Sequence, residues 1–521
     1  MIVVKTFLKS ISGCLSLCIA CLGISAQELP LERIEWGASL TANASTGSLA
    51  PYMIGSWNGG RIVNGSGVWL DAYAEKKMRL DKRFSWGAGI EALAGISNAA
   101  AYERYDAATS TWSDIGRRQA PLMLHRLYAE VKFRGVYLRA GMKESHSWIV
   151  DDRFSSGDFT RSNNAAPIPG ISAGFVDFQD IPFTRGWVQI NGEIMYGRMM
   201  DNHYKENHYN FYNFLISRDL CYTYKYCYFR TKPSEPLSVT LGMQAAGVFG
   251  GNSVYYDKGN IIRRDDRGFH IRDIFDMFFP HEGSGEGFHK GNSLGSWDFN
   301  ARYRFRNASE LCFYFEWPWE DGSGIGRRNG WDGMWGLSYD FGRRGLLQKI
   351  VVEYLDYRNH SGPLHWAPAD RPGTSLDLDA SGGDNYYNNT FYGPYSNYGM
   401  AIGTPFIMSP AYNTDGFMAF AHNRTQGMHL AFNGAFGSDW DYMVKFSHQR
   451  AWGMGRVPVA RALHNTSALV EAVWTPSSLV RGLSLRCQLA FDAGKLRGDN
   501  FGALLGVSYS ADFKISKNSK K

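Results

Sequence analysis

The stretch that decides the fold is WDFNARYRFRNASELCFYFEW, residues 297–317. Its first half alternates between polar and apolar positions, and the apolar positions are Trp297, Phe299, Ala301, Tyr303 and Phe305. After residues 307–309 the alternation resumes, with apolar residues at Leu311, Phe313, Phe315 and Trp317. Because a period of two is the period of a β-strand, the stretch predicts a hairpin with one apolar face and one polar face.

The chemistry of these two faces favours a membrane barrel over half of a soluble β-sandwich. The apolar face is rich in large aromatic side chains, and the polar face carries clustered charge. A closed barrel in lipid needs this arrangement on every strand, with apolar side chains outside and a wet lumen inside. The clearest repeat of the pattern is at residues 503–515. We therefore expect Phe313 to face acyl chains, and Tyr314 to face a lumen in which a charge costs little.

Composition excludes two other classes of protein. The mean hydropathy of −0.31 over 521 residues argues against a bundle of membrane helices, each of which needs about 20 consecutive apolar residues. Barrel strands dilute lipid-facing residues with lumen-facing ones, so their mean hydropathy is low. The net charge of +6 is mild, and the basic residues are spread along the chain. We therefore expect no nucleic-acid partner.

The N-terminus predicts a secretory signal peptide over residues 1–26, followed by one barrel domain over residues 27–521. Lys5 and Lys9 precede a short apolar core at residues 11–24, and small residues stand before Gln27. Lipidation at a cysteine within this segment is a weaker alternative. The remaining cysteines are Cys221, Cys227, Cys312 and Cys487. They are too sparse for a disulfide framework, but a bridge between Cys221 and Cys227 across a tight turn stays open.

Strand-like segments and the lengths of their connections predict an all-β, transmembrane outer-membrane barrel of about 18 antiparallel strands. The count includes strands at residues 185–199, 209–218 and 222–230. Long connections are expected at residues 46–66, 98–121, 144–184, 249–295, 320–331, 358–425 and 450–465. Short and long connections alternate along the chain, with one untidy region at residues 200–236. This alternation predicts short periplasmic turns, long extracellular loops and both termini in the periplasm.

The long loops hold the candidate binding residues. Aromatic rings stack on the apolar faces of sugars, while Asp and Asn side chains hydrogen-bond to hydroxyl groups. The candidate polysaccharide-binding residues are Trp366, Asp384, Asn385, Tyr386, Tyr387 and Tyr392. Interfacial tyrosines and Gly-Asp-Asn turns are the structural alternative. A short amphipathic helix near residues 271–278 is expected to pack into the barrel mouth. Asp377, Asp379 and Ser381 begin like a calcium loop, but no Glu closes it, and no metal or cofactor is expected.

Several segments resemble the Wzi-type capsule assembly family. They are residues 383–389 (GDNYYNN) with Tyr392, residues 398–406, residues 162–169, residues 242–251 and residues 422–424. The resemblance implies an outer-membrane barrel of about 18 strands that acts as a lectin and holds capsule at the cell surface. Two departures stand against it. The family's helical periplasmic domain has no room between Gln27 and the strand expected from Arg33, and the chain ends in a Lys-rich tail.

Three functions follow from these patterns. The first is a monomeric, non-enzymatic barrel that anchors capsular or other surface polysaccharide, with that polymer and outer-membrane lipid as partners. The alternative is a diffusion pore for oligosaccharides. An outer-membrane hydrolase is third, because the GISAG motif at residues 170–174 lacks the strand–turn–helix context of a nucleophile elbow. His203 and His208 match no zinc spacing.

Overall fold

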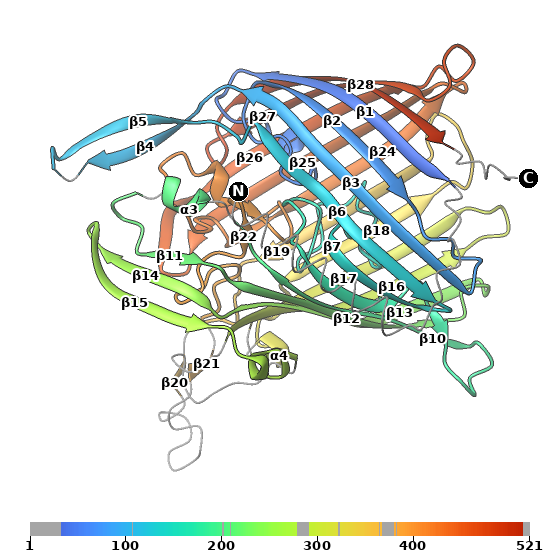
Figure 1. The fold of residues 1–521 in the computed structure, drawn as a ribbon, viewed down its shortest axis with the longest axis horizontal. Helices are drawn as coiled ribbons and strands as arrows, with labels where there is room; N and C mark the ends of the chain where they lie inside the picture. Colours follow the sequence, from blue (N-terminus) through green and yellow to red (C-terminus); the bar gives the residue numbers. More distant parts are fainter. Residues whose placement is uncertain are drawn as a thin grey trace, which may run out of the picture.

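A computed structural model describes residues 33–106, 108–200, 203–208, 210–278, 291–320, 324–363, 365–366, 380–381 and 383–513. The predicted signal peptide and the Asp377–Asp379 segment lie outside these residues. The described chain forms a closed antiparallel β-barrel, as the sequence predicts (Figure 1). The barrel closes because β1 pairs with β28 on one side and with β2 on the other.

The barrel strands follow one another around the wall in chain order. They are β1 (Ile34–Ser45), β2 (Gly67–Lys76), β3 (Phe84–Ser97), β6 (Leu122–Phe133), β7 (Val136–Met142), β8 (Gly170–Phe175) with β9 (Gln179–Asp180), β10 (Val188–Arg198), β12 (Cys221–Thr231), β13 (Leu237–Phe249), β16 (Gly291–Arg304), β17 (Glu310–Glu320), β18 (Gly333–Asp340), β19 (Lys349–Tyr357), β24 (Thr425–Phe436), β25 (Trp440–Met454), β26 (Val457–Trp474), β27 (Leu483–Gly494) and β28 (Asn500–Phe513). The sheet has 19 strands. Because β8 and β9 pair with successive parts of β10, they form one barrel strand, which gives 18 within the described residues.

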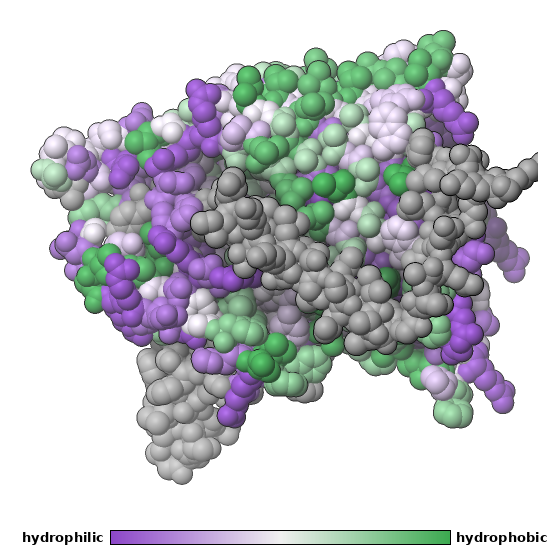
Figure 2. All heavy atoms as spheres, viewed as in Figure 1, coloured by the Kyte–Doolittle hydropathy of each residue, from purple (hydrophilic) through white to green (hydrophobic). Residues whose placement is uncertain are grey.

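The register of β16 and β17 confirms the two faces predicted for residues 297–317. Trp297 lies opposite Trp317 and Phe299 opposite Phe315, whereas Asp298 lies opposite Glu316. Exposed apolar side chains on the outside alternate with buried polar ones inside along the barrel wall. Figure 2 shows hydrophobic residues over the middle of the wall and hydrophilic residues gathered towards its two ends. This is the surface that a bilayer requires.

The predicted number of strands is correct, but two of the assignments behind it are wrong. Residues 209–218 form no barrel strand: only β11 (Leu215–Arg218) is extended there, and it pairs with β14 (Gly251–Asp257). The missing strand is β8 with β9, which lies inside the predicted long loop 144–184. Its glycines and its interruption after Phe175 weaken the alternation on which the prediction rests. The GISAG motif is therefore part of a strand between β7 and β10.

The two ends of the barrel differ as predicted. At the end where β1 begins and β28 finishes, the connections are short, such as residues 134–135, 305–309 and 437–439. At the other end the longest connections span residues 143–169, 250–290 and 358–424. The long loop expected at residues 450–465 is an error, because β25 and β26 continue through it and meet at residues 455–456. Their pairing extends past a bulge near Gly453, beyond the expected strand ends.

The cysteines resolve the question of a disulfide. Cys221 and Cys227 are both free and lie on the same strand, β12. Six residues of extended chain span roughly 20 Å, whereas a disulfide needs Cα atoms within about 7 Å. A bridge between them is therefore excluded. Among the described residues, no helix is long and apolar enough to cross a membrane.

Candidate functional site

Two of the long connections fold back and fill the lumen instead of standing outside it. Buried side chains from residues 143–169 and residues 383–424 form one hydrophobic core with the inner wall. Members of this core include Ile149, Phe154, Phe159, Tyr386, Tyr387 and Phe406, packed with the wall residues Tyr222, Tyr228, Tyr314 and Leu355. We call these two segments the plug. The wet lumen that the sequence predicts beside Tyr314 is therefore wrong, because Tyr314 is only 3% exposed.

Hydrogen bonds fix the plug to the inner wall. The amide of Ser156 donates to Glu353 on β19 (2.7 Å), and the amide of Phe159 donates to Glu316 on β17 (3.2 Å). Both carboxylates are fully buried. Because a buried carboxylate needs donors to offset its desolvation, the wall and the plug depend on each other.

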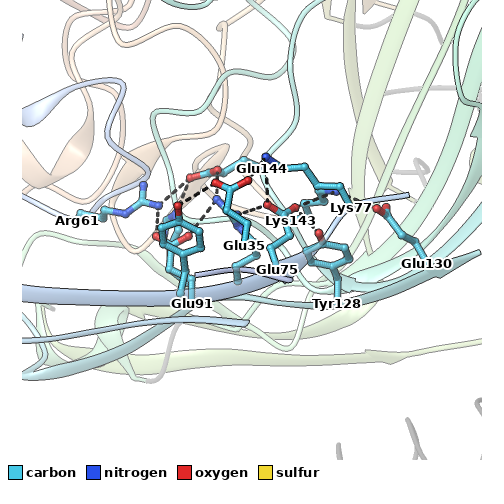
Figure 3. Close-up of polar contacts among 12 residues, drawn as sticks. Glu35, Arg61, Glu75, Lys77, Glu91, Tyr128, Glu130, Lys143 and Glu144 are labelled. Atoms are coloured by element: carbon cyan, nitrogen blue, oxygen red, sulfur yellow. Dashed lines mark hydrogen bonds and ion pairs between the residues drawn. The ribbon is translucent and has the colours of Figure 1, made fainter. Parts of the chain in front are cut away.

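A network of ion pairs joins the plug to strands β2, β3, β6 and β7 (Figure 3). Arg61, from the loop after β1, contacts Glu91 on β3 and Glu144 at the start of the plug (2.8 Å to Glu144). Arg126 on β6 contacts the same two carboxylates, at 3.0 Å and 2.9 Å. The network continues along the wall through Lys143–Glu130 (3.0 Å), Arg139–Glu130 (2.8 Å) and Tyr128–Glu75. Arg61 and Glu144 therefore tie loop segments to the wall by charge.

Four of the six predicted sugar-binding residues lie inside this packed interior. Tyr386 and Tyr387 are fully buried, and Asp384 is 7% exposed. The hydroxyl of Tyr386 donates to Asp332 (3.0 Å), and the hydroxyl of Tyr387 donates to the carbonyl oxygen of Phe159. Asp384 accepts a hydrogen bond from the hydroxyl of Ser361 (2.6 Å). In this conformation these side chains hold the plug together and face no solvent.

Tyr392 is the fourth of these buried residues and belongs to the same core as Tyr386 and Tyr387. Asn385 is half-buried and accepts a hydrogen bond from Asn423 (2.6 Å). Tyr392 is 2% exposed, and the guanidinium of Arg267 lies 4.5 Å from the centre of its ring. Trp366 belongs to a two-residue strand, β20 (His365–Trp366), paired with β21 (Ala380–Ser381). Asp384, Tyr386, Tyr387 and Tyr392 therefore present no open surface to a sugar, and the role of the six residues in sugar binding stays a prediction.

A small cleft lined by aromatic side chains lies at the loop end of the barrel. It is shallow and open to solvent, and its cavity volume is only about 20 Å³. Its lining includes the aromatic residues Tyr102, Tyr204, His208, Tyr398 and Phe417, and the polar residues Lys205, Ser396 and Asn413. We call it the aromatic cleft. Such a mixture of ring faces and hydrogen-bonding groups can contact a sugar at the surface, whereas the cavity is too small to enclose a sugar ring.

The aromatic cleft is assembled from segments far apart in sequence. Tyr102 comes from the projecting hairpin β4 (Ala100–Asp106) and β5 (Thr111–Arg117), and its hydroxyl donates to the carbonyl oxygen of Ala411 (2.7 Å) (Figure 1). Tyr204 begins the short helix α3 (Tyr204–Asn207). Gly399 follows Tyr398 with a φ of +73°, and a Cβ there would lie 2.3 Å from the hydroxyl of Tyr204. Glycine therefore allows Tyr204 to approach this backbone closely.

His208 is held in its neutral form inside the aromatic cleft. Its ring stacks on Tyr204 with centroids 3.8 Å apart, and it meets Tyr102 edge-on at 5.4 Å. Its Nδ1–H donates to the carbonyl oxygen of Tyr204 (2.8 Å). Burial lowers the pKa of His208 to about 4. Protonation of His208 therefore destabilises its packing against Tyr204 and Tyr102.

This pKa predicts a dependence of cleft stability on pH. Burial lowers the pKa of His208 from 6.5 to about 4. A conformation in which the ring is exposed to water therefore takes up a proton at a higher pH than the packed conformation does. The closed cleft is fully stable above about pH 6.5 and loses stability as the pH falls towards 4. We expect ligand binding to be constant from pH 7 to 8 and to weaken over that lower range. A titration of binding should show a flatter profile for His208→Asn, and identical profiles would contradict the role of His208.

Local sequence reasoning missed most of the aromatic cleft. Its residues come from three separate loops, and no short motif joins them. Two signals were nevertheless present: Tyr204 and His208 have helical i, i+4 spacing, and Tyr398-Gly399 belongs to the segments that carry the family resemblance. Within the described residues, no cluster of His, Cys, Asp or Glu could hold a metal ion.

Comparison with solved structures identifies the fold. Wzi, an outer-membrane protein involved in group 1 capsule assembly in Escherichia coli and a carbohydrate-binding β-barrel, matches with a TM-score of 0.52 and 13% identity. The alignment covers 92% of this chain and 84% of Wzi. The chain is an outer-membrane β-barrel.

Other outer-membrane proteins match less well. OprD from Pseudomonas aeruginosa has a TM-score of 0.44 and 9% identity, over 94% of this chain and 98% of OprD. OccK5 from the same organism has a TM-score of 0.41 and 9% identity, over 93% of this chain and all of OccK5. No family model matches the sequence, and no curated protein is significantly similar to it.

Proposed function

We propose that this barrel binds a surface polysaccharide at its extracellular mouth and anchors the polymer at the cell surface, without enzymatic activity. The observation that carries the proposal is the aromatic cleft on the outer side of a lumen filled by the plug. The family resemblance in the sequence and the carbohydrate binding of Wzi point the same way. A polymer can contact many copies of the barrel, so weak individual contacts can add up to stable retention.

A diffusion pore remains the second candidate, and one feature favours it. Arg486 on β27 points into the lumen near the turn end, yet its side chain is 58% exposed. It forms an ion pair with Glu471 on the neighbouring strand β26 (3.7 Å). Solvent therefore reaches the inner wall at this residue, as a pore requires. The buried core around Phe159 and Tyr387 separates this wet region from the mouth.

Removing the rings of Tyr204 and Tyr398 tests the anchor. Aromatic stacking contributes about 1 kcal/mol per contact, so the double change to alanine should weaken binding of purified polysaccharide about thirtyfold. Cells should release more polymer while total synthesis stays unchanged. Trp112→Ala is the matched control, because Trp112 is 55% exposed on the projecting hairpin but does not line the cleft. Unchanged retention in the double variant, with the barrel folded, would refute this site.

A further inference from the structure

The helix α4 (Ile271–Phe278) lies on the outside of the barrel, not in its mouth as the sequence predicts. The hydroxyl of Tyr196 donates to the carbonyl oxygen of Ile274 (2.7 Å), and the ammonium of Lys225 donates to that of Met277 (2.8 Å). Tyr196 shares the outward face of β10 with Ile194, which is 39% exposed, whereas Met195 between them is buried. The strand period therefore places α4 against the outer wall (Figure 1).

The wall is shaped to receive this helix. Met277 is buried against Gly247 on β13 and Gly291 on β16, where an added Cβ would lie 2.7 Å and 2.5 Å from its side chain. The small residues therefore leave a seat that Met277 fills. The ring of Phe278 lies 5.7 Å from the ammonium of Lys225. An outward-facing lysine is costly on a lipid-facing strand, and the helix C-terminus with its partial negative charge covers it.

The position of Lys225 sets the depth of α4. Lys225 lies four residues inside the loop end of β12, about 13 Å along the strand at about 3.3 Å per residue. Its cross-strand neighbour is Ile194, an exposed apolar residue of the outer wall. The C-terminus of α4 therefore lies beside the lipid-facing wall, level with apolar side chains.

The face of α4 turned away from the barrel is apolar. Ile271 is 72% exposed and Phe275 is 70% exposed, although they follow one another at i, i+4 on a single helix face. The preceding Phe269 is 53% exposed. Arg272 extends from a different side of the helix, with its side chain 83% exposed. An apolar face beside a charged one is the pattern of a helix that lies in a membrane interface.

We propose that α4 is an interfacial anchor whose Ile271 and Phe275 insert among the acyl chains of the outer leaflet, beside β12 and β13. The apolar face continues the lipid-facing wall on which the helix rests, so the same bilayer covers both. Arg272 reaches the headgroups from the polar side of the helix. The helix thereby fixes the depth and tilt of the barrel on the side where the projecting hairpin β14 and β15 (Asn260–Gly268) leaves the wall.

Spin labelling of the full chain in vesicles tests this proposal without reference to polysaccharide. A nitroxide is attached through a genetically encoded keto amino acid at position 275, so that the native cysteines remain. The protein is reconstituted in vesicles of phosphatidylethanolamine and phosphatidylglycerol. Collision rates are measured with oxygen, which partitions into lipid, and with a water-soluble nickel chelate. Leu505, 62% exposed on β28, is the lipid-facing control, and Ile262, 66% exposed on β15, is the control outside the wall.

We expect the label at position 275 to favour oxygen as strongly as the label at Leu505. Labels at Ile262 and at Arg272 should favour the nickel chelate. A label at position 275 that behaves like the label at Ile262 would overturn the proposal, because α4 would then lie in water. Dipolar coupling between labels at position 275 that grows with protein density would also overturn it, in favour of a contact between two barrels.

Discussion

Replacement of Arg61 by alanine is expected to lower the free energy of unfolding by about 3 to 5 kcal/mol, as for a broken buried ion pair. Arg61 contacts Glu91, whose side chain is 5% exposed, and Glu144 of the plug (2.8 Å). Its loss leaves Glu91 and Glu144 with Arg126 as the remaining cation and His125 as a further contact of Glu144 (3.2 Å). The buried charge that remains, rather than the lost attraction alone, makes the change costly. Unfolding in urea, with the barrel refolded in vesicles, measures the effect.

Arg79→Ala is the matched control for this experiment. Arg79 pairs with Asp81 (2.7 Å) in a turn, and both side chains are exposed. An exposed ion pair contributes about 0 to 1 kcal/mol, so this variant should unfold almost like the wild type. Equal stability of the Arg61 and Arg79 variants would show that the network in Figure 3 does not hold the plug to the wall.

The second large effect is expected from Phe313→Arg, which should cost about 2 to 4 kcal/mol. Phe313 lies on the outward face of β17 between Leu311 and Phe315, within the apolar belt. An arginine there must leave water for acyl chains. The loss should appear in the same urea titration and as a lower temperature at which the barrel loses its compact migration in detergent gels.

The control for this change must face a wet part of the lumen. Tyr314 is unsuitable, because its hydroxyl donates to the buried Glu353 (2.5 Å) and an arginine would displace the plug. Ser508 on β28 is a better choice, since it faces the lumen and is half-buried. Ser508→Arg should cost much less than Phe313→Arg. A similar cost for both changes would contradict the assignment of the two faces.

The sequence was sufficient for the barrel wall because a wall residue's environment follows from its parity. Between Trp297 and Trp317, apolar and polar residues alternate along two strands. The apolar positions face lipid and the polar positions face the lumen. The alternation did not reveal the strand at residues 170–180, because that strand is short and rich in glycine. The strand wrongly predicted at residues 209–218 replaced the missed strand in the total. The predicted number of strands was therefore correct for a partly wrong reason.

The binding residues could not be predicted in the same way. Tyr386 and Tyr387 have the composition of a sugar site, but whether they face solvent depends on how residues 383–424 fold into the lumen. Tertiary packing decides that fold, and local pattern does not encode it. The aromatic cleft brings Tyr102 and Tyr398 together from loops that are nearly 300 residues apart. Such a site becomes visible only when the loops are placed on the barrel.

The central claim is that the lumen is closed and that the mouth, not a pore, meets the polysaccharide. Current through single barrels in a planar lipid bilayer tests this claim most directly. The packed plug predicts that the inserted wild-type barrel shows no stepwise conductance in 1 M KCl, while heat-modifiable migration confirms that it is folded. Regular steps of ionic current that oligosaccharides block would contradict the account and establish the protein as a diffusion pore.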